Sequence, residues 1–200
     1  MGSSRAYPVY RSSDPLDVYA QSQRLCALLD SRDAGAHVGA ELRTVADVQR
    51  MVKLLPDMSY DPDRALTDPV TGDCLFFTGR TLPVDPVELE SLLPLLLNDE
   101  FVSGGVEASV EASFVRALGK GPATVGWTGR WPDDPALGSF GSPKYDGVQA
   151  VFNSDDSDWE RWADTHTVFV HVTKFGDLDR AQWLAAQIGG EVLGEAVLGW

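Results

Sequence analysis

The chain has 200 residues, and its 44% hydrophobic content is enough for a normal buried core. Thirty acidic residues oppose 16 Lys and Arg, so the formal net charge is −14 at pH 7. A field of this sign repels nucleic acid and anionic membranes, and it favours basic proteins, metal cations or cationic small molecules. No apolar stretch approaches the ~20 residues that span a bilayer, and no secretory signal follows the first residues, so we expect a cytoplasmic chain.

Caps and prolines predict three helices in the first half of the chain. Asp14 can cap a helix whose first residue is proline, and Thr44 can cap a second helix with Asp47 three residues further on. The dipeptide Asp85-Pro86 opens a third helix, which Pro94 kinks or ends early.

The segments between these helices are less regular. Residues 57–73 hold clusters of Asp and Pro that indicate a surface loop, and residues 74–78 predict a short strand. Residues 106–118 fit both the strand and the helix period, and their Glu, Ala and Ser content favours a helix.

The second half is predicted to be richer in strands, and its clearest strand is 167–173, where β-branched residues dominate. The expected elements are strands at 125–131 and 148–153, a short helix at 159–163, the strand at 167–173, a helix at 178–188 capped by Asp177, and a strand within 191–198.

These elements predict an α+β fold: a mixed sheet with several covering helices and a C-terminal strand–helix–strand unit. We expect a single globular domain over residues 1–200. All six Trp residues lie after residue 126, so two subdomains, 1–120 and 121–200, are the alternative.

Catalytic motifs are incomplete throughout the chain. The Gly-Ser-x-Gly sequence at Ser139 has the wrong spacing for a nucleophile elbow, and no glycine pattern matches a phosphate-binding loop. Cys26 and Cys74 are 48 residues apart, and no further Cys or nearby His completes a set of metal ligands. We interpret them as two buried free thiols or as one disulfide. His166 and His171 are five residues apart on a predicted strand, which points them to opposite faces. We therefore predict no catalytic residue, no metal site and no cofactor.

One region combines acids with aromatic residues. Between Trp131 and Asp164 there are eight acidic residues, interleaved with Trp131, Tyr145, Trp159 and Trp162. Interfaces commonly anchor on aromatic residues inside a charged rim. The alternative is that the Trp residues belong to the core and that the acids belong to a solvated loop or an acidic helix start capped by Ser154 or Asp155. The predicted protein interface comprises Trp131, Asp133, Asp134, Asp155, Asp156, Asp158, Trp159 and Glu160.

These observations favour a non-enzymatic acidic protein that binds a basic protein partner. Bacterial immunity proteins, which block a basic toxin or enzyme domain, offer an analogy in size and charge, although no residue motif is shared. Two alternatives remain: an enzyme with an unrecognised site that uses His171 and dispersed carboxylates, and a structural component of a larger assembly. The sequence leaves the oligomeric state open.

Overall fold

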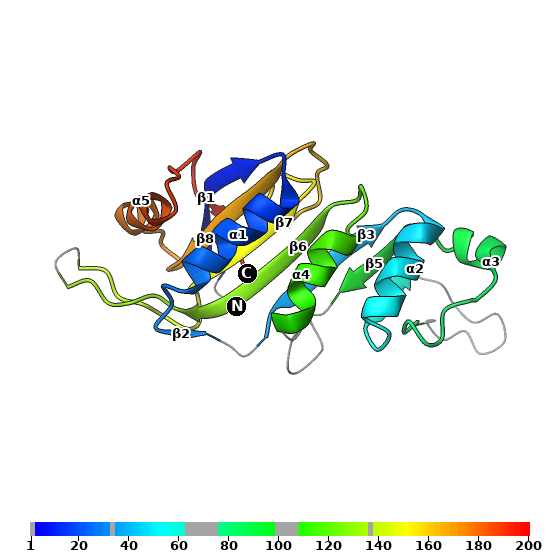
Figure 1. Ribbon diagram of the computed structural model, residues 1–200. Coiled ribbons are helices and arrows are strands. Elements are labelled where there is room, and N and C mark those ends of the chain that lie inside the picture. The colour runs from blue at the N-terminus through cyan, green and yellow to red at the C-terminus, as the bar shows by residue number, and fades with distance from the viewer. Residues whose placement is uncertain (1–2, 33–34, 63–75, 99–107, 136–137) are drawn as a thin grey trace.

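The computed structural model describes residues 3–32, 35–62, 76–98, 108–135 and 138–200, and within them nine strands form one sheet (Figure 1). Eight strands follow one another in the order β4-β5-β3-β6-β7-β8-β1-β9, and β2 pairs with β6 beside this path. All described pairings are antiparallel, so the expected mixed sheet has no parallel pair in these ranges. The strands are β1 (Arg5–Ser12), β2 (Ser31–Arg32), β3 (His37–Leu42), β4 (Ser59–Pro62), β5 (Leu95–Asn98), β6 (Ala123–Arg130), β7 (Gly147–Phe152), β8 (His166–Val172) and β9 (Val197–Leu198).

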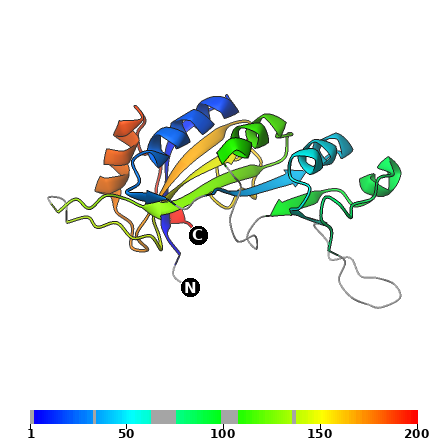
Figure 2. The same ribbon diagram turned by 60° about the horizontal axis from the view of Figure 1, so that its bottom comes forward.

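The helices lie mainly on one face of this sheet (Figure 2). They are α1 (Pro15–Cys26), α2 (Val45–Leu54), α3 (Pro86–Glu90), α4 (Ala108–Ala117) and α5 (Leu178–Gln187). The α+β class is therefore confirmed. Helix α1 packs against β7, β8 and β1, while α2 contacts β3 and α4.

The predicted caps start the helices. The Asp14 carboxylate accepts a hydrogen bond from the Leu16 N–H, and Thr44 and Asp47 form a complete capping box. Asp85 caps α3, which ends at Glu90, before Pro94. The ambiguous segment 106–118 contains α4, so the helical interpretation was right for its described part.

The C-terminal unit matches its prediction. Strand β8 lies between β7 and β1, and all of its residues are buried. Helix α5 packs against β1 and β8 through a side that includes Leu184, which is fully buried, whereas Leu178 at its first turn is half exposed. The final strand is shorter than expected, because only β9 pairs with β1.

Three local predictions were wrong or incomplete. Residues 59–62 form the edge strand β4, although their Asp and Pro content indicated a loop; Pro62 is tolerated because edge strands accept proline. Residues 159–163 form no helix. Of the predicted strand 74–78, residues 74–75 lie outside the described residues, and only Thr78 forms an isolated bridge, to Ser59. One sheet contains strands from both sides of residue 120, since β6 pairs with β3 and with β7.

The two faces of β6 differ in side-chain size beside the pocket. On β6, Val125 and Trp127 point into the main core beneath the helices, whereas Thr124, Gly126 and Thr128 point to the other face. The C-terminal segment and the loop at residues 153–165 cover part of this second face (Figure 2). The remainder forms the floor of a pocket.

Candidate functional site

The structure places the eight predicted interface residues in three different environments. Trp131 is completely buried, its indole N–H donates to the backbone oxygen of His171 at 2.8 Å, and its backbone N–H donates to Asp146 at 2.9 Å. It belongs to the core and offers no surface to a partner, so its assignment to the interface is corrected. Sequence could not reveal this, because a buried and an exposed Trp in an acidic region look alike.

Asp133 and Asp134 lie on the segment that connects β6 to β7. The Asp133 carboxylate pairs with Arg130 at 2.6 Å and accepts a hydrogen bond from the Gly141 N–H at 3.0 Å, and these contacts hold its pKa below the usual value. Asp134 exchanges backbone hydrogen bonds with Ser139. Within the described residues no hydrogen bond, ion pair or shared pocket joins these two aspartates to Asp155–Glu160.

The other five residues lie together on the loop between β7 and β8. Asp156 pairs with Arg161 at 3.1 Å, and Asp155 lies 3.8 Å from the same guanidinium. Asp158 and Glu160 are exposed and make no ion pair within the described part of the chain. The hydroxyl of Ser154 accepts a hydrogen bond from the Asp156 N–H, but a turn rather than a helix follows, so the expectation of a capped helix was wrong.

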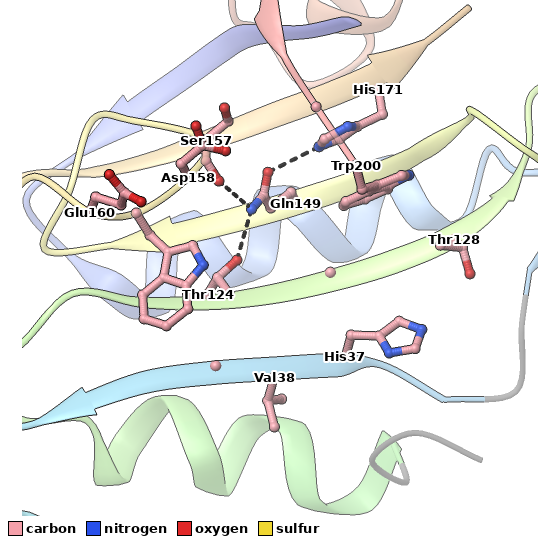
Figure 3. A pocket seen from close by; sticks show the side chains of 14 residues that line it. His37, Val38, Thr124, Thr128, Gln149, Ser157, Asp158, Glu160, His171 and Trp200 are labelled. Carbon is pink, nitrogen blue, oxygen red and sulfur yellow. Dashed lines mark hydrogen bonds between the residues drawn. The ribbon is translucent and has the colours of Figure 1, made fainter. Parts of the chain in front are cut away.

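Asp158, Trp159 and Glu160 border a pocket of about 560 Å³ on the face of the sheet that the helices leave uncovered (Figure 3). Its floor includes Gly39 of β3 and Gly126 of β6. A methyl group placed on Gly39 would lie 2.9 Å from the Trp159 ring. The ring therefore sits directly above the sheet, and glycine provides the space for it.

Trp200 forms a second aromatic wall of this pocket. Its ring stacks on the His171 imidazole with the centroids 3.5 Å apart and an interplanar angle of 7°. One edge of the ring reaches the sheet, since a methyl group on Gly126 would lie 3.2 Å from the ring and one on Gly147 only 2.6 Å from it. The C-terminal segment is held by β9 and by the Ser4 N–H, which donates to the Trp200 backbone oxygen at 2.7 Å.

A buried hydrogen-bond network lies between Trp200 and the loop that carries Asp158 and Glu160 (Figure 3). The Gln149 amide nitrogen donates to Thr124 at 3.0 Å and to the backbone oxygen of Ser157 at 2.8 Å. Its amide oxygen therefore faces Nε2 of His171, 3.0 Å away, and Nε2 must carry the proton. Nδ1 of His171 then accepts from the Ser4 hydroxyl at 2.8 Å. Every polar atom of the His171 ring is satisfied in the neutral state.

His171 is not placed as a catalytic base in this arrangement. Burial lowers its pKa to about 3, so the imidazole is neutral at pH 7. Its side-chain partners in the described structure are Ser4, Gln149 and the Trp200 ring, and none of them is a carboxylate. The alternative of an enzyme built on His171 and carboxylates finds no support in this geometry.

The two remaining candidates for chemistry also have structural roles. Ser139 bonds to Asp177 and to the buried Arg180, which ties the β6–β7 connection to the start of α5. Nδ1 of His166 accepts a hydrogen bond from the Asn153 N–H at 2.8 Å. This bond anchors the first residue of the loop at 153–165 to β8.

Comparisons with protein-family models, with curated proteins and with solved structures find no match for this chain. Among the described residues, no group of three or more His, Cys, Asp or Glu is placed to hold a metal ion. None of the helices in those ranges is both long and apolar enough to cross a bilayer.

Sequence reasoning found the rim of this pocket but missed its floor and one wall. Asp158, Trp159 and Glu160 were selected as exposed acids beside an aromatic residue. Gly126 and Trp200 were not, because they come from distant parts of the chain. The available signal was the alternation on β6, which places Thr124, Gly126 and Thr128 together on one face.

Proposed function

We propose that this protein is a non-enzymatic binding protein that engages a basic protein partner through the loop at residues 153–165. By analogy with immunity proteins, it would act in the cytoplasm as an inhibitor that covers a basic toxin or enzyme domain. The observation that carries the proposal is the pair of exposed carboxylates, Asp158 and Glu160, on either side of Trp159 at the mouth of a pocket.

Charge supports this choice of partner. The net charge of −14 attracts basic proteins at long range and disfavours nucleic acid and anionic membranes. Neither Asp158 nor Glu160 is neutralised by a cationic side chain in the described structure, and the residues lining the pocket include no Lys or Arg. Their charge is therefore available to a partner.

Trp159 supports an interface in a second way. Its backbone φ of 47° lies in the left-handed region, which costs a residue with a side chain about 1–2 kcal/mol. Such strain collects at binding and catalytic sites, where the surrounding structure maintains it. The strained residue here is the aromatic one between the two carboxylates.

The test is capture of basic proteins from a lysate of the source cells, followed by binding kinetics on the captured protein. We expect Asp158→Lys/Glu160→Lys to lower the association rate by about tenfold at low salt, because steering depends on local charge. Raising salt should slow wild-type association, since the screening length falls from ~10 Å at 0.1 M to ~3 Å at 1 M. Trp159→Ala should instead raise the dissociation rate, by about 30-fold if the ring contributes about 2 kcal/mol.

The matched control is Glu88→Lys/Glu90→Lys. These two exposed acids lie on α3, away from the pocket, and the change brings the net charge from −14 to −10, as in the test variant. Equal association rates for the two double variants would show that only the total charge matters. The loop would then not be the docking surface.

A further inference from the structure

We propose that the pocket between Trp159 and Trp200 binds a guanidinium group, the end of an arginine side chain on the basic partner. This inference rests on the proposed function, because it names the group by which that partner is held.

The two aromatic walls stand over neighbouring positions of the sheet. The Trp159 ring stands over Gly39 and the Trp200 ring over Gly126, and these glycines are diagonal neighbours on β3 and β6, because Gly39 pairs with Thr124. Diagonal neighbours in an antiparallel sheet are about 7–8 Å apart. The two rings therefore rise from neighbouring positions on the pocket floor, and a planar cation in the pocket can contact an indole face.

One face of Trp200 is open to this space. His171 occupies the opposite face at 3.5 Å, while Trp200 also lines the pocket (Figure 3). Because burial lowers the pKa of His171 to about 3, the imidazole behind the ring carries no positive charge at pH 7 that would oppose a cation.

The carboxylates determine which cation fits. Asp158 and Glu160 belong to the lining and make no ion pair within the described chain. A guanidinium presents several N–H donors in one plane, so it can stack on an indole and donate to carboxylates in the same pose. An ammonium is compact and strongly hydrated, and it has no planar face to stack on an indole.

The walls are held in place before any ligand binds. The Ser157 backbone oxygen accepts from buried Gln149 at 2.8 Å, and the Ser157 hydroxyl donates to the Leu198 backbone oxygen at 2.9 Å. Ser157 thereby joins the segment that carries Trp159 to the segment that carries Trp200. A site held in this way loses less conformational entropy on binding.

The experiment is a titration of the ¹⁵N-labelled full chain with N-acetyl-arginine methylamide, followed through the indole N–H signals. Trp159→Phe and Trp200→Phe assign the two signals. We expect saturable shifts in both, and at least about tenfold weaker binding of the citrulline derivative, which has the same shape without the charge. Asp158→Asn/Glu160→Gln should weaken arginine binding at least about fivefold, while the control Glu88→Gln/Glu90→Gln should leave it unchanged.

Three outcomes would overturn the inference: equal binding of arginine and citrulline derivatives, shifts confined to other Trp signals, or a lysine derivative that binds as tightly as arginine. Equal binding of the lysine derivative would show that the pocket binds cations in general and does not select a guanidinium. This test is independent of partner capture. If a captured protein depends on Asp158 and Glu160 but the chain does not bind the arginine probe, the docking surface stands and the guanidinium pocket is refuted. If the chain binds the arginine probe but no captured protein depends on these two residues, the docking surface is refuted.

Discussion

The neutral state of His171 makes the stability of this protein depend on pH in a calculable way. The pKa of the imidazole falls from its ordinary value of 6.5 to about 3 in the folded chain, because the ring is buried. Between pH 6.5 and about pH 3, the imidazole of His171 binds a proton in the unfolded chain but stays neutral in the folded chain. The free energy of unfolding therefore falls as pH falls from 6.5 toward 3, by about 1.4 kcal/mol per pH unit. At pH 5.0 the loss from this residue is about 2 kcal/mol.

The measurement compares wild type with His171→Gln in urea unfolding at pH 7.5 and pH 5.0. Glutamine removes the titrating group and keeps a polar side chain. Other groups with shifted pKa values, such as His166 (lowered by burial) and Asp146 (raised by burial), are common to both proteins and cancel in the comparison. We expect wild type to lose about 2 kcal/mol more than the variant between the two pH values.

An equal loss in both proteins would refute this account. The wild-type chain supplies a second check that does not require a stable variant, because the ring proton signals of His171 can be followed by NMR. They should not titrate between pH 5 and pH 8. A midpoint near 6.5 would mean that the network of Ser4, Gln149 and Trp200 does not exclude water from the ring.

Two further predictions concern packing and the junction of the pocket walls. Leu184→Ala should lower the free energy of unfolding by about 2 to 5 kcal/mol, because the side chain is fully buried, whereas Leu178→Ala on the same helix should cost about 1 kcal/mol or less; urea unfolding of both variants checks this. Ser157→Ala should cost about 0.5 to 1.5 kcal/mol through loss of the hydrogen bond to Leu198, and it should also weaken binding of the arginine probe; an unchanged probe affinity would show that this bond does not position the walls.

Local signals in the sequence predicted the helices well. The caps at Asp14 and Thr44 act through neighbours two or three residues away, so the sequence contains the whole interaction. The acidic loop was different. Its carboxylates are typical of a helix start, but Asn153 and Trp159 both adopt positive φ values, and Arg161 pairs with acids on the loop. These features depend on how the loop packs on the sheet, which no local pattern encodes.

The candidate site was predictable only in the part that is contiguous in sequence. Asp158, Trp159 and Glu160 follow one another and could be selected together. Gln149 and Trp200 reach the same pocket from β7 and from the C-terminal segment, and their contribution depends on strand order and register. Register is set by long-range pairing, so a single sequence does not reveal which strands lie side by side.

The composition of β6 explains why a pocket exists on this face at all. Toward the helices the strand presents Val125 and Trp127, which fill the core, while toward the other face it presents Thr124, Gly126 and Thr128. A face of such small side chains cannot bury itself, so bulky residues from elsewhere must cover it. Two tryptophans do so only in part, and the uncovered floor between them is the pocket. A larger side chain at Gly126 would therefore displace Trp200 and fill the proposed guanidinium site in a single step.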